Sequence, residues 1–134
     1  MNAEIFYDTN IVLYLLSADA AKADRAEELL AMGGIVSVQV LNEFTAVARR
    51  KLQMSWTDIR EIVMQIRQVC TIVNLTPETH ERACELAERY QYTIYDASIL
   101  AAALRASCAV VYSEDMQDGQ LIEQQLTIRN PFGK

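Results

Sequence analysis

Five short apolar segments, separated by longer stretches of helical character, constrain the fold of this chain most strongly. The segments lie at 3–7, 35–38, 71–75, 109–112 and 126–129. Each has the length and the apolar character of a buried strand. Helices between consecutive strands would serve as crossover connections, which are typical of a mainly parallel sheet covered on both faces. The pattern therefore predicts a three-layer α/β fold.

Helical patterns fill the intervals between these segments. We expect helices at 10–16, 20–32, 39–52, 77–90 and 95–106. A further helix begins after Ser55, because Ser55 and Asp58 have the spacing of a capping box. Ile59 and Ile62 then begin an apolar series at i, i+3, i+4 and i+7, which indicates one buried helix face.

Length and charge limit what the chain can be. The 134 residues fit one domain spanning 1–134, and 51% hydrophobic residues are enough to form a core. Lys and Arg number 12 against 18 Asp and Glu, which gives a formal net charge of −6. This balance argues against a protein that holds nucleic acid by bulk positive charge. It allows an enzyme whose acidic site reaches phosphates through a bound metal.

The cysteines and the N-terminal region predict a cytoplasmic protein. Three widely spaced cysteines without a CxxC pair disfavour both a disulfide scaffold and a thiolate zinc site. Glu4 and Asp8, with no Lys or Arg, precede the apolar stretch 11–16, and this is the wrong charge for a secretory signal. No apolar run approaches the roughly 20 residues that span a membrane. We therefore expect a soluble chain with no membrane partner.

Four acidic residues on separate segments lie near one edge of the predicted sheet. Asp8 ends the first strand, and Asp115 follows the fourth. Asp96 begins the helix that leads to the fourth strand, and Glu43 lies about one helical turn after the second strand, on the apolar side of its helix. In parallel α/β sheets, ligands bind outside the carboxyl ends of the strands, where the strand order switches direction. The sequence therefore predicts a site that gathers these carboxylates.

Each of these acids also has a simpler structural interpretation. Asp8 and Asp96 stand where Asp is favoured as a helix cap. Asp115 and Asp118 lie in a stretch that is typical of a turn. Glu43 is harder to explain in this way, since a carboxylate that faces a core needs a compensating partner. The convergence of four acids on one edge favours the functional interpretation.

Convergent carboxylates repel one another. At about 4 Å and an effective dielectric constant near 20, two unit charges cost on the order of 4 kcal/mol, so the group needs protons or a cation. An all-oxygen site suits Mg²⁺ or Mn²⁺ rather than zinc. A carboxylate-bound Mg²⁺ in a crevice favours phosphodiester hydrolysis, in which the ion activates water and neutralises charge on the phosphate.

Four stretches and a short ending carry a family resemblance. They read YDTNIVL at 7–13, SVQVLNEF at 37–44, YDASILAAA at 95–103, YSEDMQDGQ at 112–120 and NPF at 130–132. In this order and spacing, they make the chain similar to the PIN-domain family, which includes the VapC ribonuclease toxins of toxin–antitoxin pairs. The resemblance runs nearly from end to end. It implies a five-stranded parallel sheet in the order 3-2-1-4-5, with the first and fourth strands side by side.

The same resemblance implies the residues of the site. The family's four metal-binding acids correspond here to Asp8, Glu43, Asp96 and Asp115. Ser113 matches the family's Thr or Ser two residues before the last acid. Thr9 and Asn10 match polar residues that position water or substrate. Asp118 is a further acid that either assists the metal or remains a loop residue.

The function implied by the resemblance is a Mg²⁺-dependent endoribonuclease, with Mn²⁺ as the other candidate ion. Its substrate would be RNA, and its partner a cognate antitoxin protein. By family analogy, the stretch 117–132 and the early helices form the surface of a homodimer. The alternative is a PIN-domain nuclease with a role other than that of a toxin.

Two other Mg²⁺-binding classes have a similar layered sheet, and both are disfavoured. A receiver-type signalling module has a phosphoacceptor Asp after the third strand and a Lys further on. Here the third strand runs into Asn74-Leu75-Thr76, and the only later Lys is Lys134. A haloacid-dehalogenase-type phosphatase has a second Asp where Asn10 stands in this chain.

Two weaker signals have both a structural and a nucleic-acid interpretation. The dense basic run Arg49-Arg50-Lys51 lies where cations are expected at a helix C-terminus, and a contact with RNA phosphate is the alternative. Tyr90, Tyr92 and Tyr95 could stack on bases, although aromatic residues at a helix junction more often belong to a core.

Overall fold

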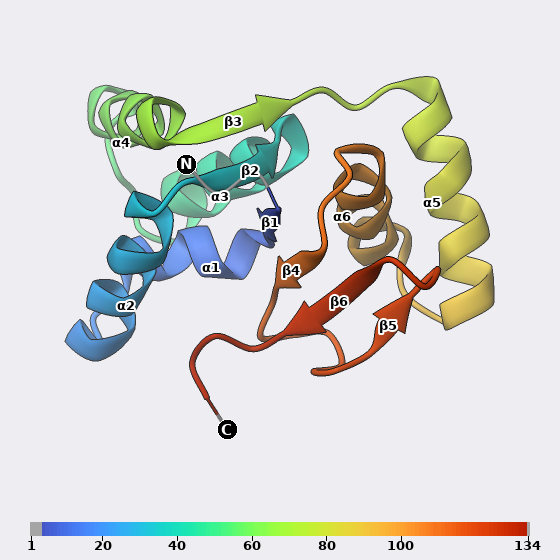
Figure 1. Cartoon of the computed structure of the whole chain (residues 1–134). Coiled ribbons are helices and arrows are strands. Elements are labelled where there is room, and N and C mark those ends of the chain that lie inside the picture. Colours follow the sequence, from blue (N-terminus) through green and yellow to red (C-terminus); the bar gives the residue numbers. More distant parts are fainter. Residues whose placement is uncertain (1–3, 134) are drawn as a thin grey trace.

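A six-stranded sheet forms the centre of the protein, and helices cover it (Figure 1). The computed structural model describes residues 4–133. The strands are β1 (Ile5–Tyr7), β2 (Gly34–Ser37), β3 (Cys70–Val73), β4 (Val110–Tyr112), β5 (Leu121–Ile122) and β6 (Leu126–Arg129). Their order across the sheet is β3-β2-β1-β4-β6-β5. The pairs β3–β2, β2–β1, β1–β4 and β4–β6 are parallel, whereas β5 pairs antiparallel with β6.

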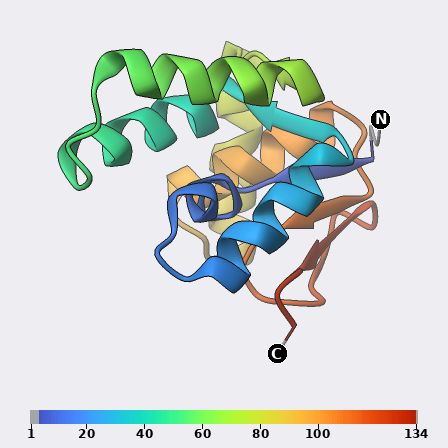
Figure 2. The ribbon, with the colours of Figure 1, turned by 90° about the vertical axis from the view of Figure 1, so that its left-hand side faces the viewer.

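The helices fall into two groups by their contacts. They are α1 (Thr9–Leu13), the short 3-10 helix η1 (Tyr14–Leu16), α2 (Ala20–Ala31), α3 (Val38–Arg50), α4 (Trp56–Val69), α5 (Pro77–Tyr90) and α6 (Ile94–Arg105). Helix α1 contacts α3, α2 contacts α4, and α5 packs along α6. The first group, α1–α4, lies in the connections from β1 to β2 and from β2 to β3, which proceed toward one edge of the sheet. The second group, α5 and α6, lies in the connection from β3 to β4, which proceeds in the opposite direction. Because such connections are right-handed, the two groups lie on opposite faces of the sheet. Both groups can be followed by colour, blue to green and yellow to orange, in Figures 1 and 2.

The strand order predicted from sequence is confirmed, with β6 as the predicted fifth strand. The structure differs from the five-stranded expectation at one edge, where it adds β5. This strand is short and joins β6 through a tight turn in which Glu123 and Gln124 have positive φ values of 53° and 57°. Gly or Asn usually marks such a turn in a sequence, and neither occurs here.

Side-chain caps fix where several helices begin. The Ser37 hydroxyl accepts from the backbone N–H of Val40 at 3.3 Å, so α3 starts at Val38, a residue expected in a strand. Ser55 caps α4 and Thr76 caps α5, as the sequence predicts. Ala3, the first residue of the first predicted strand, lies outside the described residues.

Strand β1 belongs to the core, and its three residues are all buried. The Tyr7 hydroxyl lies 2.7 Å from the carbonyl oxygens of both Leu29 and Gly33, and so joins β1 to the end of α2. Gly34 lies against the Tyr7 ring so closely that a Cβ there would come within 2.4 Å of it. Within residues 4–133, no helix combines the length and the apolar character needed to cross a bilayer.

Candidate functional site

Asp8 lies at the carboxyl end of β1, beside the end of β4. Its backbone N–H donates to the Tyr112 carbonyl at 2.9 Å, and its side chain is only 5% exposed. One carboxylate oxygen accepts from the Thr9 backbone N–H at 2.7 Å. The other accepts from the Ser113 hydroxyl, also at 2.7 Å. Asp8 is therefore both the N-cap of α1, as its simpler interpretation suggests, and a buried carboxylate at the predicted edge.

The environment of Asp8 disfavours its ionised form. Burial raises the pKa of this carboxyl to about 6. The hydrogen bonds from Ser113 and Thr9 act in the opposite direction, and the nearby charges of Asp96 and Asp115 raise the pKa further. A cation at this place would reverse the balance, because it would favour the ionised carboxylate.

Glu43 reaches the same region from α3. The Thr9 hydroxyl donates to Glu43 Oε1 at 2.5 Å, and Gln39 Nε2 donates to Oε2 at 3.0 Å. These are the compensating partners that a carboxylate on the apolar side of a helix needs. Two of the residues predicted to belong to the site, Thr9 and Glu43, are thus in direct contact.

Asp96 lies in the first turn of α6, and it is not the cap of that helix. Thr93 is the N-cap, since its hydroxyl accepts from the Asp96 backbone N–H at 3.1 Å. The capping interpretation of the Asp96 side chain is therefore wrong. Partial burial raises the pKa of Asp96, and the charges of Asp115 and Glu43 raise it further.

The loop after β4 folds around Ser113, which is fully buried. The Ser113 oxygen accepts from the backbone N–H groups of Asp115 and Met116, each at 3.2 Å, while its hydroxyl donates to Asp8. Asp115 itself is exposed at the surface of the site. A single hydroxyl therefore links the loop that carries Asp115 to the carboxylate of Asp8.

The four acids form a loose set. Among residues 4–133, no three His, Cys, Asp or Glu side chains form a ready-made metal-binding group. The electrostatic effects on Asp8 and Asp96, which are secondary to burial, nevertheless connect all four carboxylates. Uncompensated like charges keep apart, and a divalent cation would offset that repulsion. The all-oxygen donors fit a hard ion such as Mg²⁺, which retains several waters and needs few direct protein ligands.

Two further predicted residues have different surroundings. The Asn10 side-chain oxygen lies 3.5 Å from the backbone nitrogen of Glu114, and its buried amide nitrogen has no hydrogen-bond partner among residues 4–133. Asp118 is exposed, and it accepts from the backbone N–H of Asn130 at 2.9 Å. Asp118 thus anchors the C-terminal segment to the loop, which fits its description as a loop acid.

The three residues of the basic run at the end of α3 have different surroundings. The Arg49 guanidinium donates to the Met54 carbonyl at 2.8 Å and lies 5.2 Å from the centre of the Trp56 ring. Arg49 therefore holds the turn between α3 and α4. Arg50 and Lys51 are exposed at the helix end, where the helix dipole favours cations.

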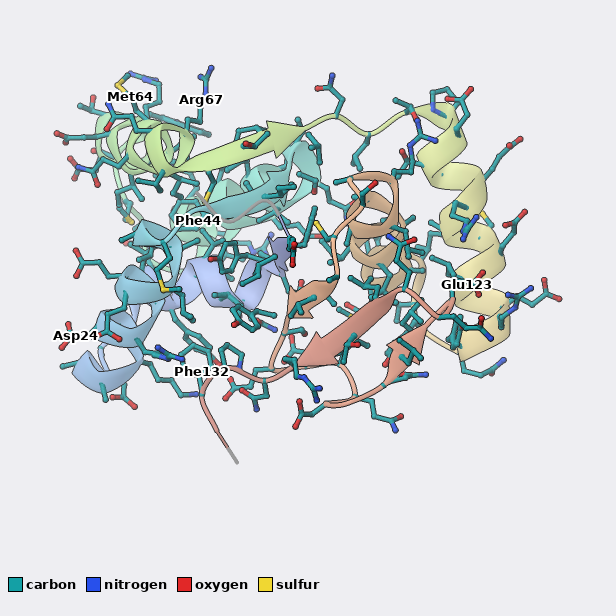
Figure 3. All side chains as sticks on the ribbon, in the orientation of Figure 1. Asp24, Phe44, Met64, Arg67, Glu123 and Phe132 are labelled. Atoms are coloured by element: carbon teal, nitrogen blue, oxygen red, sulfur yellow. The ribbon has the colours of Figure 1, made fainter. Side chains whose placement is uncertain are left out.

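A cluster of side chains beside the site could not be predicted from the sequence. The Tyr14 hydroxyl donates to the Glu114 carboxylate, and Lys22 Nζ lies 3.3 Å from both side chains. The Tyr14 ring meets Phe132, labelled in Figure 3, edge-on at 5.0 Å. These residues come from distant parts of the chain and share no periodic pattern. Gln39, by contrast, could have been found, because it stands at i−4 from Glu43 on a helix.

The chain is similar in fold to known proteins. Residues 5–117 match the family model described as PIN domain. No curated protein matches the chain. A solved toxin–antitoxin complex from Klebsiella pneumoniae is similar at 20% identity, with a TM-score of 0.72 and coverage of 99% of this chain and 100% of that one.

Two other solved structures have the same fold at low identity. The toxin VapC20 of Mycobacterium tuberculosis, which cleaves the Sarcin-Ricin loop, is 23% identical, with a TM-score of 0.67 and coverage of 83% of this chain and 89% of that one. VapBC2 from Rickettsia felis, bound to a DNA fragment from their promoter, is 16% identical, with a TM-score of 0.64 and coverage of 94% and 97%.

Proposed function

The chain belongs to the PIN domain family, and from that membership we propose that it is a metal-dependent endoribonuclease and the toxin of a toxin–antitoxin pair. One observation carries the proposal. Hydrogen bonds connect the segments that carry four acidic residues near the carboxyl end of the two central strands, where α/β sheets bind ligands. The acids are Asp8, Glu43, Asp96 and Asp115.

In this proposal, the four acids hold Mg²⁺, for which Mn²⁺ can substitute. A bound divalent cation supplies Lewis acidity and a countercharge for phosphodiester hydrolysis. It also accounts for RNA binding by a chain of net charge −6, because the substrate meets a cation at the site. Arg50 and Lys51, which are exposed, are candidates for contacts with more distant phosphates.

The neighbouring hydroxyl groups prepare the carboxylates for this task. Burial raises the pKa of Asp8, and the hydrogen bonds from the Ser113 hydroxyl and the Thr9 backbone N–H oppose that rise, which favours the ionised form that binds a cation. The Thr9 hydroxyl and Gln39 occupy one oxygen each of Glu43 and so restrict its rotation. The buried N–H₂ group of Asn10 has no hydrogen-bond partner among residues 4–133, and Asn10 is the candidate to orient water or substrate.

The biological role rests on the solved structures that have the same fold. One of them is a toxin that cleaves an RNA loop, and another is a toxin–antitoxin complex. They support an RNA substrate and an antitoxin partner for this chain, and a homodimer is part of the same proposal. Three widely spaced cysteines without a CxxC pair favour the reducing cytoplasm as the place where the protein would act. A PIN nuclease without an antitoxin is the alternative.

Incubation of the purified protein with structured RNA tests the enzymatic part. We expect cleavage in the presence of Mg²⁺, no cleavage with EDTA, and none by Asp96→Asn. Asp19→Asn is the matched control, since Asp19 is an exposed cap of α2 whose side chain accepts from the Ala21 backbone N–H. Cleavage without metal, or equal cleavage by Asp96→Asn, would contradict the proposal.

Expression in a bacterial host tests the role as a toxin. We expect growth arrest by the wild-type chain, normal growth with Asp8→Ala, and rescue when a small protein encoded by the adjacent reading frame is co-expressed. Cleavage in vitro without growth arrest would favour the nuclease that has another role.

A further inference from the structure

The three tyrosines near the start of α6 have different surroundings. The Tyr90 hydroxyl donates to Glu123 at 2.9 Å, and the Tyr92 hydroxyl donates to Gln120 at 2.6 Å. Both rings are half-buried against the core. Tyr95 is 67% exposed, the highest value among the exposed large hydrophobic residues of 4–133. The core interpretation holds for Tyr90 and Tyr92 and fails for Tyr95.

Although its ring is exposed, the main chain of Tyr95 is held in place. Its carbonyl accepts from Gln39 Nε2 at 3.5 Å, and the same amide nitrogen donates to Glu43 at 3.0 Å. The next residue is Asp96, whose backbone N–H is bound to the Thr93 hydroxyl. Consecutive Cα atoms lie about 3.8 Å apart. The Tyr95 ring is therefore carried by a fixed backbone directly beside two of the acids.

Isolated exposed hydrophobic side chains are common, so exposure alone assigns no role. The position is what distinguishes Tyr95. An exposed neutral aromatic ring has no attraction for a phosphate, but it can stack on the face of a nucleobase. A phosphate held at the four acids would bring the bases of the adjoining nucleotides into this neighbourhood.

We propose that Tyr95 stacks on an unpaired nucleobase next to the phosphate that is cleaved. This inference rests on the proposed ribonuclease function and adds a residue that positions the RNA, and it requires an unpaired base because bases within a duplex are already stacked on one another. The preferred RNA has an unpaired nucleotide at the cut, in a loop, a bulge or a single strand. A duplex of the same sequence is a poor substrate.

Binding and cleavage measurements with variants of Tyr95 test the proposal. The probe is a short single-stranded RNA in which 2-aminopurine replaces one base at a time. Its fluorescence is quenched when the modified base stacks. We expect quenching at one or two positions next to the cut with the wild type and with Tyr95→Phe, and none with Tyr95→Ala. Tyr95→Ala should weaken RNA binding by about 5- to 100-fold, and Tyr95→Phe by less than about 2-fold.

The matched control is Met64→Ala on α4. Met64 is 60% exposed, so the change removes a similar exposed apolar side chain at another surface, and RNA binding should not change. Tyr95→Leu separates stacking from simple apolar contact. A full loss of quenching by Tyr95→Leu is expected, and full retention by Tyr95→Leu would overturn stacking.

The outcomes separate the two proposals. If the wild type cleaves RNA with Mg²⁺ while Tyr95→Ala binds and cleaves equally well, the stacking proposal is wrong and the ribonuclease proposal stands. If Tyr95→Ala instead loses self-association in sedimentation and keeps its RNA affinity, the ring contacts protein and the stacking proposal is again wrong. If the wild type neither binds nor cleaves RNA, both proposals fail together.

Discussion

The Ser113 hydroxyl donates to Asp8 Oδ2 at 2.7 Å and so joins the end of β4 to the end of β1. The same oxygen accepts from the backbone N–H groups of Asp115 and Met116. One buried hydroxyl therefore orients one candidate ligand and shapes the loop that carries another. No basic residue takes part in this link, so the hydroxyl can hold Asp8 and the loop together before a cation binds.

Replacement of Ser113 by Ala should disturb both functions of this hydroxyl. The change removes the donor that lowers the pKa of Asp8, so that pKa should rise above its present value of about 6. It also leaves two backbone N–H groups without their acceptor, at a cost of about 1–3 kcal/mol in the free energy of unfolding. Urea unfolding measures the cost, and the pH profile of RNA cleavage should move to higher pH.

Ser113→Thr is the control for this prediction, because it keeps the hydroxyl. Its extra methyl group costs packing energy at a fully buried position, so the pH profiles are compared rather than the stabilities. The profile of Ser113→Thr should match that of the wild type. A profile for Ser113→Ala that also matches would mean that the hydrogen bond does not influence Asp8.

The strand ends could be predicted from sequence because each acid follows a short apolar run. Asp8 after β1 and Asp115 after β4 are examples, since the carboxyl ends of parallel strands share one edge. Cap signals are equally local, and yet the sequence predicts a strand that continues through Val38, one residue past the end of β2 at Ser37. The reason is that Val38 is β-branched and continues an apolar run, while the cap depends on a hydroxyl that folds back to Val40.

Contacts between distant residues gave no such signal. Glu114 is 92 residues from Lys22 and 100 residues from Tyr14, and neither pair has a period or a motif. The antiparallel β5 was also missed, because its turn contains Glu123 and Gln124 rather than Gly or Asn. Local preferences predict elements and their ends, whereas packing in three dimensions decides which distant side chains meet.

Gly34 should be the least replaceable glycine of the described chain. A Cβ at this position would lie 2.4 Å from the Tyr7 ring and 2.9 Å from the Ile5 carbonyl, and its φ is +144°. Gly34→Ala should lower the free energy of unfolding by about 3 kcal/mol or more. Gly119→Ala is the control. The φ of Gly119 is +87°, but the atom nearest to an added Cβ, on the Arg129 side chain, is 3.9 Å away. We therefore expect a loss of about 1 kcal/mol in the free energy of unfolding. Equal losses in urea unfolding would contradict the steric argument.

Glu123 should stabilise the β5–β6 turn mainly above acidic pH. Hydrogen bonds from Tyr90 and Arg89 lower the pKa of its carboxyl, with Arg82 adding to the effect. A lowered pKa means that the contribution is present above the unfolded value near 4.5 and is lost as the pH falls below it. Glu123→Gln should therefore cost about 1 kcal/mol at pH 7 and much less at pH 3.5.

Thermal unfolding of Glu123→Gln across this range checks the sign. Glu28→Gln is the control, because the ion pair of Glu28 with Arg25, at 3.6 Å, is exposed. That change should have little effect at either pH. If Glu123→Gln lowered the unfolding temperature more at pH 3.5 than at pH 7, the pKa of Glu123 would not be lowered in the folded protein.

Asp8→Asn should stabilise the protein when no divalent ion is present. The pKa of Asp8 rises from 3.8 to about 6, so its contribution to stability is present below pH 3.8 and is lost as the pH rises through about 6. Each unit by which the pKa differs between the folded and unfolded states corresponds to about 1.36 kcal/mol in the free energy of unfolding. Asn removes this charge but also loses the acceptor for Ser113, so a net gain of about 1–2 kcal/mol at pH 7.5 is expected. The gain should disappear near pH 4.

Addition of Mg²⁺ should reverse this order of stability. An ion that binds only the folded wild type adds about 2.7 kcal/mol when its concentration is 100 times the dissociation constant, whereas Asp8→Asn lacks the charge to hold it. Thermal unfolding at pH 7.5, with EDTA and then with increasing Mg²⁺, measures both states. Asp19→Asn, an exposed cap that keeps its acceptor, should follow the wild type throughout. If the wild type and Asp8→Asn responded equally to Mg²⁺, Asp8 would not be a ligand, because only one of the two carries the carboxylate.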